Sequence, residues 1–382
     1  MDDAELTNRS SRVRQTMRGL SEQVVLEAIL AAGPITRPEI SSRTKLSKPT
    51  VSEAVRSLMQ ERLIRSAGLR SGSPGRSPVS YVVDDAAGHV IGVDIGGSYV
   101  RVGAADLFGE LLSKRREPQA SPDPAELAKQ VSTMVAEMVR ATSATHSQVL
   151  AVAVSLPHSW HRGPAAESLL SVVRERVGVP VIGDSHLNLN AIGEKWRGFG
   201  AGISDFVFLS VGAECGAGIV VGDELVRGNR LAAGNIEVML DLPLRDANGP
   251  RPLGGGMSAD AMLLQARQLQ WHDGVPTTIE GVFARASGEA SARRLISMEA
   301  RRVAFVGAAI CALLDTELLV LGGGIGSHPE LYAEVKELLA GMLSEPPRLE
   351  TSLLRDEAAL FGAIATGIRG AHDRLISREA LA

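Results

Sequence analysis

Aromatic residues and cysteines are scarce in this chain of 382 residues, and long apolar runs are absent. Aromatics make up 3% of the residues, too few for a surface that stacks the bases of single-stranded nucleic acid. The two cysteines, Cys215 and Cys311, stand alone in apolar settings without a histidine at ligand spacing, which argues against disulfides and a zinc site. No apolar run reaches the roughly 18 residues of a membrane span, and the acidic N-terminus lacks the apolar stretch of a signal peptide. We therefore expect a cytoplasmic protein without a membrane partner.

Charge is distributed unevenly along the chain. Residues 7–82 hold 13 Lys and Arg against 5 Asp and Glu, a net charge of +8, whereas the whole chain carries −4 and the remainder therefore about −12. The length exceeds one ordinary core, so two or three domains are expected. A basic N-terminal segment on an acidic body indicates that this segment binds nucleic acid.

Two helix-start signals lie a dozen residues apart in the basic segment. Thr36 and Glu39 have the spacing of a capping box, and Pro38 falls in the first turn, where its missing N–H is harmless. Ser47 followed by Pro49 repeats the start signal. Because only a few residues separate the two predicted helices, the pattern is that of a helix-turn-helix.

The second of these helices has one apolar and one polar face. Val51, Val55, Leu58 and Met59 recur at helical spacing and predict the buried stripe. The opposite face would meet a major groove, or, in the simpler interpretation, would be the solvated side of an ordinary helical hairpin. The residues assigned to DNA here are Ser47, Lys48, Thr50, Ser52, Glu53 and Arg56, with Ser47 as helix cap.

Three flanking features favour a winged helix over a plain hairpin. A further helix is predicted at 20–32, a strand at 63–65, and a second strand at 81–83, after a turn rich in Gly, Ser and Pro. Arg76 lies in that turn. It either enters a narrow minor groove as part of an extended wing or belongs to a flexible linker, and both interpretations stay open.

From His89 onward, predicted strands and helices alternate in two successive sets, the second beginning near Asp205. Each set opens with β-hairpins and continues into helices. Two such sets predict two α/β lobes that meet at a cleft.

Glycine-rich turns occur in a specific order along these two sets. The first follows a buried strand and places Asp94 beside Gly96 and Gly97, where a phosphate or Mg²⁺ could be held. The glycine-rich and neighbouring motifs are Val90 to Ser98, Gly193 to Lys195, Gly212 to Gly218, Leu321 to Gly326 and Ala358 to Ile364. In these motifs and their order, the chain resembles the ROK family (repressor, open reading frame, kinase) from about residue 20 to 370.

The resemblance implies an actin/hexokinase-like fold of two lobes, preceded in the repressors of the family by a winged helix. It also implies a sugar-binding cleft, ATP-dependent phosphorylation in the kinases, and operator binding controlled by a sugar or a partner in the repressors. We expect a flexible N-terminus at 1–18, the winged helix at 19–83, an N-lobe at 84–186 and a C-lobe at 187–357. A C-terminal helix within 358–382 is expected to pack back on the N-lobe.

The chain departs from the kinase pattern at the catalytic base. Kinases of the family have Asn-Asp, with the Asp as general base, where this chain has Ser185 and His186. His186 could accept a proton, but a structural role is favoured without the neighbouring amide. Asp184 lies nearby, yet its spacing to Glu194 disfavours it as the base.

The sugar, zinc and phosphate motifs have changed as well. Asn235 and Val238 replace the family's sugar-binding Glu and zinc-binding His, and Met257 begins the segment that replaces Cys-Leu-Glu. Glu214 stands in the phosphate loop, where a carboxylate would repel a triphosphate. We therefore expect neither metal nor cofactor, and no enzymatic activity.

The sequence thus predicts a ROK-family transcriptional regulator, a repressor that binds an inverted-repeat operator in double-stranded DNA as a homodimer or dimer of dimers. A sugar kinase fused to a DNA-binding domain, supported by Asp94 and the glycines, is the competing hypothesis. Control by a partner protein is a third. The effector is open between an atypical small molecule, a phosphosugar and none, and its candidate contacts are Asp94, Gly96, Gly97, Ser185, His186, Asn235 and Glu237.

Overall fold

The computed structural model describes residues 19–69, 78–143, 148–157, 160, 163–236, 243–246, 249–252 and 257–377. The predicted flexible segment 1–18 and two candidate contacts, Arg76 and Glu237, lie outside these residues. None of the described helices is long and apolar enough to cross a membrane.

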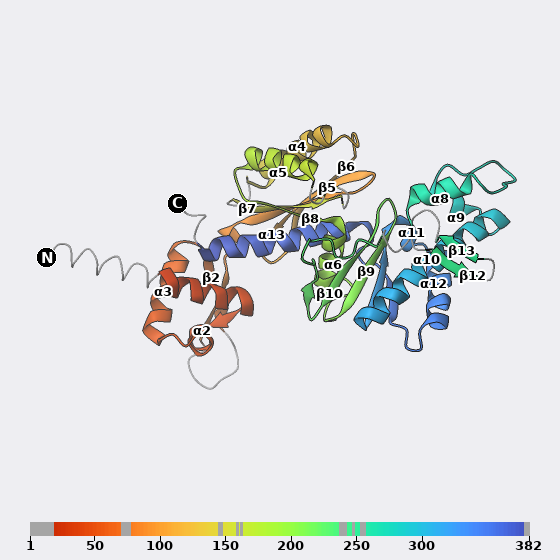
Figure 1. Ribbon diagram of the computed structural model, residues 1–382. Coiled ribbons are helices and arrows are strands. Elements are labelled where there is room, and N and C mark those ends of the chain that lie inside the picture. Colours follow the sequence, from red (N-terminus) through yellow and green to blue (C-terminus); the bar gives the residue numbers. More distant parts are fainter. Residues whose placement is uncertain are drawn as a thin grey trace.

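A winged helix stands at one end of the molecule, away from the C-lobe (Figure 1). Residues 19–32 are helical, and three short strands form a sheet in the order β1-β3-β2. Both wing strands were predicted from the sequence, whereas β1 has only two residues and so leaves no alternating pattern to detect. The elements that follow the helix at 19–32 are β1 (Ile35–Thr36), α2 (Arg37–Thr44), α3 (Lys48–Gln60), β2 (Ile64–Leu69) and β3 (Val79–Val83).

The apolar stripe of α3 differs at one residue from the predicted one. Val51, Ala54, Val55 and Leu58 are at most 2% exposed, whereas Met59 is 39% exposed. The prediction for Met59 was wrong because position i+8 lies about 80° around the helix from position i. Ala54, at i+3, lies within the stripe and takes its place.

The N-lobe is built on a five-stranded sheet in the order β6-β5-β4-β7-β8. Strands β4, β5 and β6 are antiparallel neighbours, and β7 and β8 continue the sheet in parallel with β4. Helices α4 and α5 cover one face and α13 crosses the other (Figure 1). The elements are β4 (His89–Ile95), β5 (Tyr99–Asp106), β6 (Leu111–Pro118), α4 (Pro124–Ser143), β7 (Val149–Leu156), α5 (Pro164–Val177), β8 (Val181–Ser185) and α13 (Ala358–Ser377).

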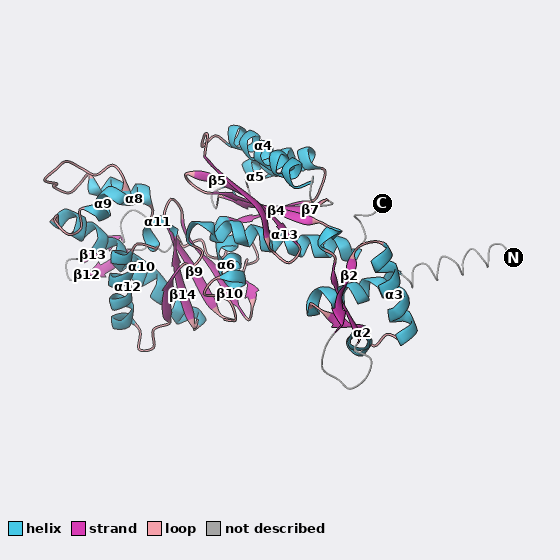
Figure 2. Cartoon of the chain, turned by 180° about the vertical axis from the view of Figure 1, so that it is seen from behind, coloured by secondary structure: helices cyan, strands magenta, loops and turns pink. Residues whose placement is uncertain are grey.

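The C-lobe repeats this arrangement in a second sheet, ordered β11-β10-β9-β14-β15 (Figure 2). Three strands are again antiparallel and two are parallel, so the duplication expected from the sequence is present in the strand pairing. A two-stranded hairpin, β12-β13, lies outside this sheet. The elements are β9 (Phe206–Val211), β10 (Cys215–Val221), β11 (Glu224–Leu225), β12 (Pro243–Asp246), β13 (Gly249–Pro252), α8 (Ala259–Ala266), α9 (Ile279–Ala284), α10 (Ala290–Leu314), β14 (Leu318–Gly322), α11 (Gly323–Gly326), α12 (Pro329–Met342) and β15 (Arg348–Thr351).

Two helices at the centre join the parts of the molecule. Helix α6 (His186–Arg197) packs against α13 on one side and the C-lobe sheet on the other. Helix α13 runs from the C-lobe side beneath the N-lobe to the winged helix (Figure 1). One buried apolar cluster contains both Leu58 of α3 and Leu375 of α13. The core of the winged helix is therefore continuous with that of the body.

Candidate DNA-binding surface and interlobe cleft

The turn between α2 and α3 is fixed by side-chain hydrogen bonds. The Ser41 hydroxyl donates to the Leu46 carbonyl oxygen at 2.7 Å, and Lys45 takes a left-handed conformation with φ 61°. The Ser47 hydroxyl accepts from the Thr50 N–H at 3.3 Å and caps α3. Because the turn is held at both ends, the angle at which α3 leaves it is defined by the chain itself.

The polar face of α3 is presented to solvent. Lys48, Glu53 and Arg56 are exposed, while Thr50 and Ser52 are half-buried. Lys48 and Arg56 have no ion-pair or hydrogen-bond partner among the described residues. Two cations without partners on an exposed helix face are suited to phosphates and guanine edges of a DNA duplex.

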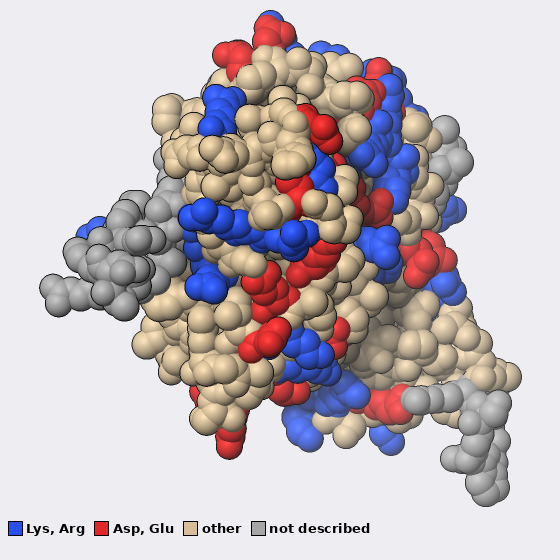
Figure 3. Space-filling model, turned by 90° about the vertical axis from the view of Figure 1, so that its right-hand side faces the viewer, with Lys and Arg blue, Asp and Glu red and all other residues tan. Residues whose placement is uncertain are grey.

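Two arginines near α3 differ in this respect, because each already has a partner. Arg65 of β2 pairs with Asp85 at 2.9 Å, and the Arg37 guanidinium lies over the ring of Tyr81, 5.1 Å from its centroid. Away from the winged helix, the face turned to the viewer in Figure 3 shows Lys and Arg interspersed with Asp and Glu. Arg65 and Arg37 are therefore less available to a DNA duplex than Lys48 and Arg56 are.

Asp94, near the end of β4, is fully buried and already has cationic neighbours. Arg101 donates from Nη1 to Asp94 Oδ2 at 3.0 Å and from Nη2 to Asp356 Oδ2 at 2.5 Å. His186 Nδ1 lies 3.3 Å from Asp94 Oδ1 and 3.1 Å from Ser155 Oγ. The carboxylate that would serve a metal or phosphate is thus held between an arginine and a histidine.

The charge of His186 follows from this neighbourhood. Burial lowers the pKa of His186, but the hydrogen bond and charge of Asp94, together with the charge of Glu214, outweigh burial, and the net pKa is raised. A raised pKa favours the imidazolium, which cannot accept a proton from a sugar hydroxyl.

The other residues predicted to contact an effector lie in turns and at a helix start. A Cβ on Gly97 would lie 2.9 Å from the Ala213 Cβ, so the first glycine turn meets the C-lobe loop directly. Ser185 caps α6 by accepting from the Leu187 N–H at 3.3 Å. Gly96 lies beside Arg101, and Asn235 is exposed in a turn after Gly234. The structure brings Asp94, Gly96 and His186 together.

Two further carboxylates, Asp184 and Glu194, are structural. Asp184 accepts from Arg227 Nη2 at 2.8 Å and from Asn188 Nδ2 at 2.7 Å. Glu194 is fully buried and accepts from the Ser352 hydroxyl at 2.6 Å and the Phe199 N–H at 2.9 Å. Both therefore tie chain segments together and are not available as a base.

Sequence reasoning missed three of the residues around Asp94, namely Arg101, Ser155 and Asp356. A signal existed for Arg101, since it is the direct cross-strand partner of Asp94 in the β4-β5 hairpin. Ser155 lies on the neighbouring parallel strand, and Asp356 comes 255 residues after Arg101, so no local pattern relates them.

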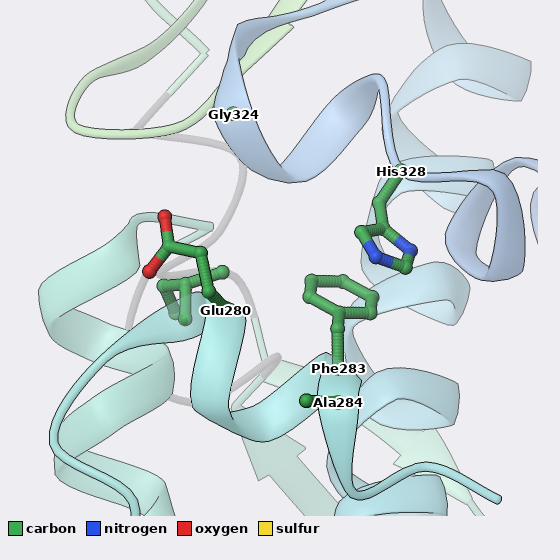
Figure 4. Close-up of a pocket in the computed structure, with 6 residues that line it drawn as sticks. Glu280, Phe283, Ala284, Gly324 and His328 are labelled. Atoms are coloured by element: carbon green, nitrogen blue, oxygen red, sulfur yellow. The ribbon is translucent and has the colours of Figure 1, made fainter.

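A cavity of about 250 Å³ lies in the C-lobe beside the third glycine-rich turn (Figure 4). The rings of Phe283 and His328 are stacked on one wall, with centroids 3.7 Å apart. Glu280 rises from α9 on the side of Gly324. A carboxylate next to this turn makes the site unfavourable for a phosphate group.

A ROK family model matches residues 90–368, and a MarR family model matches residues 23–77. The chain belongs to the ROK family. The xylose repressor of Caldicellulosiruptor bescii is 24% identical over 384 residues, which cover 91% of this chain and 95% of that protein. The β-glucoside kinase of Listeria monocytogenes is 26% identical over 288 residues, 71% of this chain and 94% of the kinase.

Solved structures similar to this chain also include both regulators and kinases of the family. A ROK family transcriptional regulator, described as a homologue of the E. coli MLC protein, covers 95% of this ROK chain with a TM-score of 0.72 at 20% identity, and 98% of its own length is matched. A ROK hexokinase from Thermus thermophilus covers 75%, with a TM-score of 0.60 at 24% identity and 99% of its own length matched. Among these four relatives, the two regulators match along the winged helix and body, whereas the two kinases match the body.

The zinc site that the family resemblance implies does not fit this chain. Its histidine position is Val238, outside the described residues. In the part of the chain that the structure describes, no group of three or more His, Cys, Asp or Glu is placed to hold a metal ion.

Proposed function

We propose that this ROK-family chain is a transcriptional repressor that places α3 in the major groove of its operator. The observation that carries the proposal is the exposed, unpaired pair Lys48 and Arg56 on a helix whose start is fixed by Ser47. Thr50, Ser52 and Glu53 lie between these cations and would add contacts to base edges. Arg76, outside the described residues, is proposed as the wing contact to the minor groove.

The proposed binding unit is a homodimer, or a dimer of such dimers. A two-fold axis would place two copies of α3 in successive turns of the major groove, about 34 Å apart. The operator would then be an inverted repeat, because a two-fold protein reads a two-fold site.

We propose that control enters through the body, by a sugar-like effector in the cleft. The C. bescii relative is named a xylose repressor, which makes a pentose the first ligand to test. The proposed contacts are Asp94, Gly96, Gly97, Ser185, His186, Asn235 and Glu237. Control by a protein partner is the alternative, and it would leave DNA binding insensitive to any sugar.

We further propose that phosphoryl transfer has been lost. Arg101 and His186 neutralise Asp94, and His186 stands at the position of the family's general base with its pKa raised by Asp94 and Glu214 against the effect of burial. Incubation with ATP and a panel of hexoses and pentoses should produce no sugar phosphate in a coupled assay. Turnover that disappears in Asp94→Asn would show that the chain is a kinase.

The DNA-binding proposal is tested with Lys48→Ala and Arg56→Ala. Each removes a phosphate or base contact worth about 1–3 kcal/mol, so operator affinity should fall about fivefold to a hundredfold. Affinity is measured by fluorescence anisotropy on DNA selected in vitro with the full chain. Thermal unfolding should be unchanged, because both side chains are exposed.

Arg301→Ala is the matched control, since Arg301 is an exposed arginine on α10, in the C-lobe. It should bind DNA as tightly as the wild type. Equal affinity of Arg56→Ala, Lys48→Ala and wild type would remove the assignment of α3 as the recognition helix.

A further inference from the structure

A second cavity, of about 390 Å³, lies between α6 and α13. It is lined by the C-terminal half of α6, whereas His186, one of the proposed effector contacts, stands at the first position of that helix. The cavity is therefore separate from the proposed effector contacts. Its volume falls in the lower part of the range of small-molecule sites, about 300–1,000 Å³.

One wall of the cavity is apolar and held in place. Ile192, Trp196 and Ile368 contribute to it. The Trp196 ring makes an edge contact with Phe361, with centroids 6.3 Å apart, and the Arg197 guanidinium lies 4.3 Å from the indole centroid. An indole held by these two neighbours is a preorganised surface for a flat ring.

The polar side chains that line the cavity differ in whether they already have a partner. Lys195 is already engaged, since its Nζ donates to the Ile203 carbonyl oxygen at 2.7 Å and to Asp223 Oδ1 at 2.5 Å. Arg369 is exposed and has no ion-pair or hydrogen-bond partner among the described residues. Burial lowers the pKa of His372, although Asp373 and a backbone bond at Leu107 act in the opposite direction. Arg369 is thus the cation of the cavity that is free to bind an anion.

We propose that this cavity is an effector site for a small aromatic carboxylate. The ring of the ligand would lie on Trp196 between Ile192 and Ile368, and its carboxylate would accept two hydrogen bonds from Arg369. Arginine presents a planar fork that matches a carboxylate, and the tryptophan favours a flat ring over a branched chain.

The position of the cavity connects it to the winged helix. Trp196 and Ile368 pack against the buried cluster that contains Leu58 of α3 and Leu375 of α13. A ligand that changes the separation of α6 and α13 would act on this shared core and so on the orientation of α3. This coupling rests on the proposed function, whereas ligand binding itself does not.

Binding is tested by tryptophan fluorescence on the full chain. The sequence has three tryptophans, and Trp160→Phe with Trp271→Phe leaves Trp196 as the remaining one. Benzoate is the probe, and benzamide is its uncharged match. Benzoate should change the emission saturably, whereas benzamide should bind about tenfold or more weakly because it lacks the charge. Calorimetry on the unsubstituted chain gives the same comparison if the double variant does not fold.

Arg369→Gln should weaken benzoate binding about tenfold, to the level of benzamide, and Arg301→Gln should leave it unchanged. If millimolar benzoate gives no saturable signal, or if Arg369→Gln and wild type bind benzoate equally tightly, the cavity is not the proposed ligand site.

Coupling to DNA binding is tested on DNA selected with the full chain. Saturating benzoate should shift the DNA affinity of the wild type and not that of Arg369→Gln. An unchanged DNA affinity overturns the coupling. If the chain selects no DNA, the proposed function fails, and the fluorescence titration still tests whether the cavity binds benzoate.

Discussion

Glu299 is a fully buried carboxylate on α10, and its Oε1 has no hydrogen-bond partner among the described residues. Burial raises the pKa of Glu299 to about 7, although Arg302, which donates from Nη1 to Oε2 at 3.0 Å, acts in the opposite direction. In the unfolded chain the group has its ordinary pKa of 4.5. The folded state therefore favours the protonated form.

A pH dependence of stability follows from this difference. The contribution of Glu299 is fully present below pH 4.5 and is lost as the pH rises through about 7. Between pH 5 and 8 this amounts to about 3 kcal/mol of unfolding free energy. Urea unfolding at the two pH values should show a smaller change in Glu299→Gln than in wild type, because the amide does not titrate.

Glu280→Gln provides the matched control for this titration. Glu280 is an exposed carboxylate in the same lobe. Its variant should follow the pH dependence of the wild type. If the curve of Glu299→Gln also runs parallel to the wild type, the buried carboxylate is ionised throughout and the expectation is wrong.

The surroundings of Asp94 could be predicted from the sequence only in part. The sequence marked Asp94 and His186, and the structure brings them within 3.3 Å. The cross-strand partner Arg101 could have been found from hairpin register. Asp356 could not, because its contact with Arg101 depends on how η3 (Arg355–Glu357) is placed against the N-lobe.

Helices α6 and α13 approach each other closely where they cross, because glycines at the crossing have no side chain. A Cβ on Gly362 would lie 1.8 Å from the Leu189 carbonyl oxygen, and one on Gly193 would lie 2.0 Å from the Ala358 carbonyl oxygen. Both neighbours are backbone atoms and cannot swing away. Gly362→Ala should therefore destabilise the chain by about 3 kcal/mol, measured by urea unfolding.

Gly341→Ala is the control for this crossing. Gly341 lies in the last turn of α12, where a Cβ would meet nothing within 4 Å. The substitution should change stability by less than about 1 kcal/mol, because only helix propensity is involved. Equal effects at the two glycines would mean that the helices do not cross as closely as described.

Long helices and strands with a regular apolar pattern could be predicted from the sequence, whereas short strands could not. The long helices α4 and α10 and the buried strands β4, β5 and β7 leave clear periodicities or apolar runs. The hairpin β12-β13 and the edge strand β15 have four residues in each strand, and their pairing depends on distant partners. Short strands of this kind are decided by tertiary contacts that no local pattern records.

At the scale of the whole molecule, the sequence predicted a winged helix on a two-lobe body, and the family matches confirm this architecture. It did not predict that the winged helix would share one buried cluster with α13. That continuity arises because apolar residues of β4, β7 and α13 face the same side of the N-lobe sheet as the base of the winged helix. A rigid connection of this kind would let the body fix the spacing between two winged helices in the proposed dimer.

A fixed spacing between the two winged helices would make operator binding depend on the distance between the half-sites. If two rigidly held copies of α3 read half-sites one helical turn apart, inserting 5 base pairs between the half-sites turns one of them by half a turn, to the opposite face of the duplex. The dimer could then engage one half-site, and affinity should fall at least about tenfold. Inserting 10 base pairs restores the face and should recover part of the loss. The control replaces the central base pairs without changing their number, which leaves the geometry intact. Tight binding to the 5-base-pair insertion, measured by anisotropy at fixed salt, would show that the winged helices move independently of the body.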